Sequence, residues 1–227
     1  MQPILRVTTT TGFSRREHLI VVVLIALMII DDLVFSAYLS DINNYLVIDY
    51  AKKTLLLVAC FSTASFRRSV TQAFGVPDIP WAGTGWFNPH LLILIAGALL
   101  LDQGITWLDL HGNRLAGNPV YQHVPPYHDD LIKYFDLTFG LLWNAVAEET
   151  FYRAVLITML YGLLPRTLPC ILIAGILFGL AHWSQGPVSV GAIIIGGWIL
   201  GMLYCVTGSI VPGIIVHYIS NLIAFTP

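Results

Sequence analysis

Three short segments of the sequence carry acidic, basic and imidazole side chains at spacings that could support hydrolysis. They read EETFYR (148–153), FGLAH (178–182) and HYISN (217–221). A glutamate can accept a proton from water and return it to a leaving amine. Imidazoles can orient that water or bind a metal ion, and an asparagine amide can donate a hydrogen bond to the oxyanion of a tetrahedral intermediate. Together these groups suffice to hydrolyse an amide bond.

Helical spacing separates the roles of the two adjacent glutamates. Glu149 and Arg153 are four residues apart, so they would share a helix face and can form an ion pair. Glu148 is rotated by about 100° from its neighbour and therefore points elsewhere. We predict that Glu148 is the catalytic carboxylate and that Glu149 pairs with Arg153. The same spacing recurs between Phe178 and His182 and between His217 and Asn221.

The composition indicates that helices buried in lipid hold these segments. Hydrophobic residues make up 56% of the 227 and charged residues 11%, and the mean hydropathy is +0.76. Soluble domains carry about 25% charged residues. The net charge of −2 provides no basic surface, so we expect no nucleic-acid partner. The three cysteines are scattered through apolar runs and indicate neither a disulfide framework nor a metal site.

Hydropathy predicts an all-α fold, a polytopic transmembrane helical bundle of about seven spans. We expect a single integral membrane domain over residues 1–227, with the catalytic motifs in 144–221. Lys52 and Lys53 interrupt the second span, and Asp102 is expected near a helix end. The fourth span is expected to continue as a helix to about residue 164. The candidate spans are 18–39, 45–65, 90–108, 131–150, 169–185, 188–206 and 209–225.

Basic residues in the short loops predict the orientation of the bundle. Because such residues are enriched on the cytoplasmic side, the arginines that flank the first, second and fifth spans would share that side. We expect a multi-pass protein of the prokaryotic inner (plasma) membrane, while the side on which cleavage occurs stays open. The arginines are Arg6, Arg15, Arg16, Arg67, Arg68 and Arg166.

The three segments also resemble the motifs of a known family. EETFYR matches EExxxR, FGLAH matches FxxxH, and HYISN matches HxxxN, in that order. The pattern is similar to that of the CAAX protease and bacteriocin-processing family, also called CPBP or Abi. These proteins are intramembrane endopeptidases and include the enzymes that trim prenylated CaaX proteins. The motifs cover residues 148–221, about a third of the chain.

The resemblance implies a role for each motif residue. Glu148 is similar to the family's water-activating glutamate, and Glu149 with Arg153 to its supporting pair. His182 and His217 resemble the two motif histidines, and Asn221 resembles the asparagine that stabilises the oxyanion.

Two mechanisms are compatible with these residues. The family was long described as metalloproteases, whereas structural work is usually read as a metal-independent glutamate mechanism. Glu148, His182 and His217 would form an acceptable zinc set, with Asn221 or water as the fourth ligand. We favour the glutamic type without a cofactor and keep zinc as the alternative.

The expected partners are the lipid bilayer and a peptide or protein substrate, such as a C-terminal sorting segment or a leader segment. Prenylated CaaX proteins, bacteriocin precursors and sorting tails of surface proteins all fit. A non-catalytic membrane immunity or binding protein of the same family is one alternative function. Another is a small transporter that uses its carboxylates for proton coupling, although the internal repeats typical of transporters are not evident.

Overall fold

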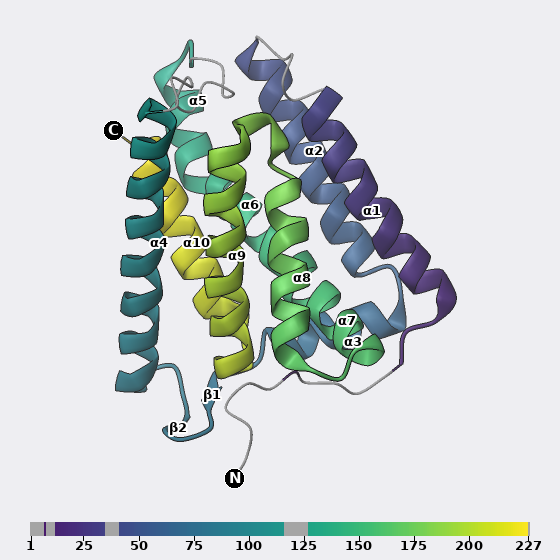
Figure 1. Ribbon diagram of the computed structural model, residues 1–227. Helices are drawn as coiled ribbons and strands as arrows, with labels where there is room; N and C mark the ends of the chain where they lie inside the picture. Colours follow the sequence, from purple (N-terminus) through teal and green to yellow (C-terminus); the bar gives the residue numbers. More distant parts are fainter. Residues whose placement is uncertain (1–6, 8–11, 35–40, 116–126, 227) are drawn as a thin grey trace.

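The structure is a computed structural model that describes residues 7, 12–34, 41–115 and 127–226. These residues are almost entirely helical, which confirms the predicted all-α class (Figure 1). A two-stranded antiparallel hairpin, β1 (Asp78–Ile79) and β2 (Gly83–Thr84), precedes the fourth helix. The α-helices are α1 (Arg15–Val34), α2 (Ile42–Cys60), α3 (Ala64–Ala73), α4 (Pro89–Leu115), α5 (Asp130–Phe135), α6 (Leu141–Glu149), α7 (Thr158–Leu163), α8 (Thr167–Leu180), α9 (Pro187–Thr207) and α10 (Val211–Phe225).

Local sequence signals explain where several of these helices begin and end. Ser14 and Glu17 form a reciprocal cap at the start of α1, where the Ser14 backbone N–H donates to Glu17 Oε2 at 2.7 Å. The Asp41 side chain caps α2 by accepting from a backbone N–H of its first turn. Pro187 opens α9, and Gly208 ends it with a φ of 67°, a left-handed conformation that glycine adopts without strain.

The helices pack as a bundle in which segments distant in sequence are neighbours. α8 packs along α9, which also packs against α4, while α10 contacts α4, α6 and α9 (Figure 1). Small residues allow a close approach between α8 and α9. A Cβ atom added to Gly197 of α9 would lie 3.0 Å from the Cα of Gly175 in α8. This contact is typical of helix pairs in membranes, where small residues let backbones approach.

The segment from α5 to α7 is one continuous helical run, and its end at Leu163 agrees with the predicted end near residue 164. Two π-helical segments interrupt its α-helical geometry, η2 (Asp136–Gly140) and η3 (Thr150–Ile157). η3 begins immediately after Glu149, inside the EETFYR segment. Single π-helical turns within α-helices occur frequently at functional sites. Hydropathy and motif spacing did not predict this change of helix type.

Two of the described helices, α4 and α9, are long and apolar enough to cross a membrane, and α8 and α10 are shorter apolar helices. The bundle buries only 11% of the most apolar stretch of α4, so this helix exposes apolar side chains that suit a lipid environment. The number of about seven spans stays a prediction.

Two expectations about charged residues in the spans need correction or refinement. α2 passes through Lys52 and Lys53 as an unbroken helix. The expectation that Asp102 lies near a helix end is wrong, because it occupies the middle of the 27-residue helix α4. A half-buried charge in the middle of an apolar helix suggests a polar cavity beside it.

Five of the six arginines that flank the predicted spans gather at one end of the bundle, and the sixth, Arg6, lies outside the described residues. α3, which carries Arg67 and Arg68, lies at the same end as the first residues of α1 and α8 (Figure 1). Arg15 and Arg16 begin α1, and Arg166 immediately precedes α8. This clustering agrees with the shared side inferred from the sequence, and its identity as the cytoplasmic side stays a prediction.

Candidate active site

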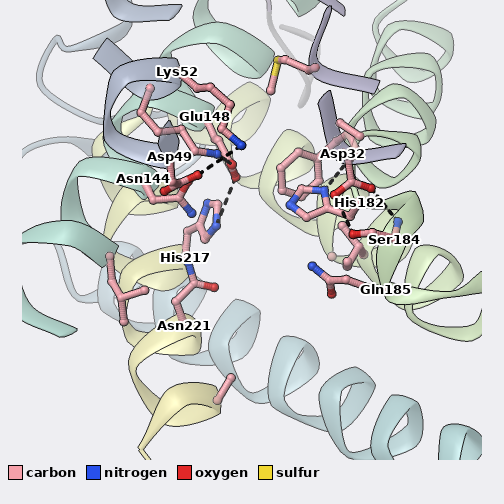
Figure 2. A pocket seen from close by; sticks show the side chains of 18 of the residues that line it. Asp32, Asp49, Lys52, Asn144, Glu148, His182, Ser184, Gln185, His217 and Asn221 are labelled. Carbon is pink, nitrogen blue, oxygen red and sulfur yellow. Dashed lines mark hydrogen bonds and ion pairs between the residues drawn. The ribbon is translucent and has the colours of Figure 1, made fainter. Parts of the chain in front are cut away.

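One cavity of about 550 Å³ receives side chains from all three motifs. Glu148 from the last turn of α6, His182 just after α8, and His217 and Asn221 from α10 all line it. In Figure 2, His217 and Asn221 lie on one side of the cavity and His182 lies opposite them. The volume falls within the usual range of about 300–1,000 Å³ for small-molecule and cofactor sites.

One carboxylate oxygen of Glu148 has an ion-pair partner, and the other has no hydrogen-bond partner among the described residues. Its side chain is 1% exposed, and Oε1 forms an ion pair with the Nζ atom of Lys53 from α2. The other oxygen, Oε2, has no hydrogen-bond partner in the described part of the chain and lies 3.7 Å from Nε2 of His217. Buried acceptors in proteins usually have a hydrogen-bond partner. A water molecule or a donor group of a substrate could donate to this oxygen.

Glu149 contacts Arg153 of its own motif and His217 of another, and so connects two motifs. Its Oε2 atom forms an ion pair with Nε of Arg153 at 3.1 Å, as the spacing of four residues predicts. Its Oε1 atom accepts from Nδ1 of His217 at 3.0 Å. Because a carboxylate only accepts, Nδ1 of this imidazole carries the hydrogen, and its Nε2 atom faces Glu148. Gly213 makes this approach possible, since a Cβ there would lie 3.0 Å from Glu149 Oε2.

The phenylalanine of the FxxxH segment, Phe178, contacts the guanidinium of the first motif and both motif imidazoles. The Arg153 guanidinium lies 4.8 Å from the centroid of the Phe178 ring, a cation–π distance. The same ring makes edge-to-face contacts with His182 and His217, at centroid distances of 5.0 and 6.0 Å. Phe178 therefore fixes the relative positions of the two imidazoles, a role that its spacing alone did not indicate.

His182 is oriented by the backbone and by a contact from α1. Its Nδ1 atom donates to the Phe178 carbonyl at 2.9 Å, which leaves Nε2 free to accept. Two residues later, the Ser184 backbone N–H and hydroxyl both donate to the Asp32 carboxylate, at 2.6 and 2.7 Å (Figure 2). Asp32 thus ties the segment after α8 to the end of α1. Asn221 is half-buried, and its side chain has no partner among the described residues, so its amide is available to a ligand.

Lys53 is the main member of the site that the sequence reasoning missed. Only 13% of its side chain is exposed, and it contacts the one motif carboxylate that faces the cavity. The signal was present in the sequence, because an ionisable residue within a membrane helix usually has a buried partner. Lys53 was interpreted as an interruption of the second span. That interpretation overlooked its partner Glu148, which lies 95 positions away in the sequence.

The described residues give a poor fit to a zinc ion. Zinc requires about four nitrogen, oxygen or sulfur ligands close together, and an ammonium group cannot be one of them. Lys53 occupies Oε1 of Glu148, and no three His, Cys, Asp or Glu side chains in the described ranges are grouped as metal ligands. The contact from Glu149 to His217 would nevertheless orient an imidazole for ligation as well as for proton transfer.

Comparison with known proteins supports the family suggested by the motifs. Residues 131–223 match the family model described as Type II CAAX prenyl endopeptidase Rce1-like, and this segment contains all six predicted site residues. No curated protein and no solved structure matches the chain. The matched segment covers less than half of the chain and begins in α5. Members of the matched family are peptidases and integral membrane proteins, and residues 131–223 are similar to them, in agreement with the resemblance that the three motifs indicate.

Proposed function

We propose that the protein is an intramembrane endopeptidase in which Glu148 activates water to hydrolyse a peptide bond of a protein or peptide substrate. The observation that carries the proposal is the unpartnered Oε2 atom of Glu148, buried in a cavity that His182, His217 and Asn221 also line. We further propose that the bundle crosses a prokaryotic inner membrane about seven times. The substrate would present a C-terminal sorting segment or a leader segment to this cavity.

The reaction proceeds in two proton transfers. Water hydrogen-bonded to Glu148 Oε2 loses a proton to that carboxylate as its oxygen attacks the scissile carbonyl carbon. The His182 Nε2 atom accepts a hydrogen bond from the other O–H of the water, which stays on the attacking oxygen, and this contact orients the oxygen lone pair. Asn221 donates to the resulting oxyanion, a contribution worth about 2.7–4 kcal/mol where a similar donor has been deleted. Glu148 then gives its proton to the leaving nitrogen as the carbon–nitrogen bond breaks.

The remaining motif residues hold this geometry. Glu149 accepts from His217 and fixes the tautomer in which Nε2 faces Glu148, while Arg153 balances the charge of Glu149. Lys53 favours the ionised form of Glu148, because an opposite charge in contact stabilises a buried carboxylate. Lys53 is therefore a positioning residue that keeps the proton acceptor ready.

Replacing Lys53 by methionine is expected to lower kcat for peptide cleavage by about 10²-fold with KM nearly unchanged, because a buried carboxylate without its counter-charge takes up a proton. Lys53→Arg retains the positive charge and should recover most of the rate. The measurement is the release of new N-termini from a defined peptide pool by the protein in liposomes. Equal kcat for the methionine variant and the unmodified protein would refute this role.

A matched control for this experiment is Lys133→Met. Lys133 lies in α5 and does not line the cavity. Its replacement by methionine removes one lysine charge, as Lys53→Met does. Because this charge lies outside the cavity lining, the Lys133→Met variant should keep the kcat of the unmodified protein. A comparable loss in both methionine variants would point to a general effect of charge on the bundle and away from a specific contact with Glu148.

Metal chelation separates the glutamic mechanism from the zinc alternative. Since Lys53 contacts the carboxylate that zinc would need, we expect 1,10-phenanthroline to leave the cleavage rate within about twofold of its starting value. The peptide assay in liposomes measures this directly, with a known zinc protease as the positive control. Loss of cleavage under chelation, followed by recovery with added Zn²⁺, would favour the zinc mechanism.

A further inference from the structure

The cavity that contains Glu148 is strongly acidic. Seven carboxylates and two ammonium groups line it, an excess of five negative charges when the imidazoles are neutral. The basic groups are Lys52 and Lys53. The acidic residues are Asp31, Asp32, Asp49, Asp102, Asp109, Asp136 and Glu148.

The two lysines compensate only part of this charge. Lys53 contacts Glu148, and the Lys52 Nζ atom lies 2.6 Å from Asp31 and 3.7 Å from Asp49. Lys52 is therefore shared between two carboxylates. Each lysine neutralises one negative charge, so the acidic excess of the cavity persists after these contacts are formed.

Neutral hydrogen-bond donors among the described residues contact three of the other carboxylates, and these donors add no positive charge to the cavity. Asp32 accepts from Ser184, and Asp136 accepts from two tyrosine hydroxyls at 2.5 Å each. Burial and this contact raise the pKa of Tyr127, one of the two, so it stays protonated and neutral. Asp109 accepts from Asn113 and Ser189.

Asp102 differs from these carboxylates. It lies half-buried on α4 and lines the cavity, and its carboxylate forms no hydrogen bond or ion pair with any residue in the described ranges.

Two neighbouring segments of the sequence carry no acidic, lysine or arginine side chain. Segments 35–40 and 116–126 follow α1 and α4, two helices that line the cavity, and contain no Asp, Glu, Lys or Arg. The arginine cluster on α1, α3 and the start of α8 lies toward the opposite end of the bundle from the end of α1, where Asp32 lies (Figure 1).

We infer that the substrate segment bound in this cavity is cationic, with lysine or arginine side chains on an apolar background. The inference rests on the proposed peptidase function. A carboxylate without a counter-charge, such as Asp102, is costly in a lipid-shielded bundle, and a positive ligand offsets that cost. The apolar background follows from leucine and methionine side chains, among them Leu27, Met28 and Leu200, that share the lining. Asp102 is the carboxylate most available to such a ligand.

Three probe peptides test this inference. They share one apolar sequence, differ only in carrying two lysines, two glutamines or two glutamates, and have an N-methylated backbone that resists hydrolysis. Binding to the full chain in neutral-lipid nanodiscs is measured by fluorescence anisotropy. The lysine peptide should bind at least about tenfold tighter than the glutamine peptide, the glutamate peptide should bind weakest, and salt should reduce the difference. Equal binding of the lysine and glutamine peptides, or tighter binding of the glutamate peptide, would overturn the inference.

Variants of the acidic residues localise the effect. Asp102→Asn should reduce the preference for lysine over glutamine about fivefold, whereas Asp102→Glu retains the charge and should retain the preference. Asp130→Asn is the matched control, because this exposed carboxylate lies outside the cavity lining. Equal losses in the Asp102→Asn and Asp130→Asn variants would contradict a role for the cavity.

Peptides with an ordinary backbone separate this inference from the proposed function. A lysine peptide that binds preferentially but is never cut would uphold the cationic specificity and refute the peptidase. Cleavage of all three peptides with equal affinity would uphold the peptidase and refute the cationic specificity.

Discussion

Replacing Glu148 by glutamine is expected to lower the rate of peptide cleavage on the order of 10²–10⁴-fold, because an amide cannot accept the proton of the attacking water. Glutamine has nearly the same size and can still accept from Lys53, so the cavity should keep its shape. Cleavage is measured as new N-termini released from a defined peptide pool by the protein in liposomes.

A stability control is needed because the glutamine variant leaves the buried Lys53 ammonium without its counter-charge. The double variant Glu148→Gln/Lys53→Met removes both charges and should unfold at a temperature close to that of the unmodified protein, yet remain inactive. If the single glutamine variant cleaves the pool at the unmodified rate, Glu148 is not the proton acceptor.

Removing the Arg153 side chain is expected to cause the largest loss of stability. The Arg153 side chain is 2% exposed, and it is the only basic side chain, apart from an imidazole, that contacts Glu149 in the described residues. Arg153→Met leaves a buried carboxylate uncompensated, which typically costs about 3–5 kcal/mol. Thermal unfolding of the purified protein in detergent measures the loss.

Two variants show whether the lost charge or the lost packing against Phe178 is responsible. Arg153→Met combined with Glu149→Gln removes both charges and should recover part of the loss. Arg68→Met removes an exposed arginine and should change the unfolding free energy by less than about 0.5 kcal/mol. An Arg153→Met variant as stable as the unmodified protein would show that this ion pair contributes nothing to the fold.

The sequence allowed the helices and the motif residues to be predicted because both depend on local periodicity. The apolar runs located the main helices, and the spacing of Glu149 and Arg153 placed them on one helix face, where they pair. The match of residues 131–223 to a Type II CAAX prenyl endopeptidase Rce1-like model supports the family inferred from three short motifs. Catalytic roles were inferred from residue type and resemblance, and they stay proposals.

Features that depend on tertiary contacts could not be predicted in this way. In the sequence, Lys53 is only a charged residue that interrupts an apolar span. Its role becomes visible when α2 lies beside α6, because its ammonium group then contacts Glu148. Asp102 was expected at a helix end because a charge in an apolar helix is costly, yet the cavity beside α4 accommodates it. The change to π-helical geometry at Thr150 likewise has no signature in hydropathy.

The hydrolase account is tested most directly by comparing protein termini in membranes of the native host that express the unmodified protein or the Glu148→Gln variant at equal abundance. Mass spectrometry of labelled N- and C-termini detects cleavage of any membrane or soluble protein, whatever its sequence. The account predicts at least one new pair of termini, flanking a single cleaved bond, that appears with the unmodified protein and is absent with the variant. Identical termini in both membranes, together with an unchanged biological effect, would contradict hydrolysis and favour a binding protein.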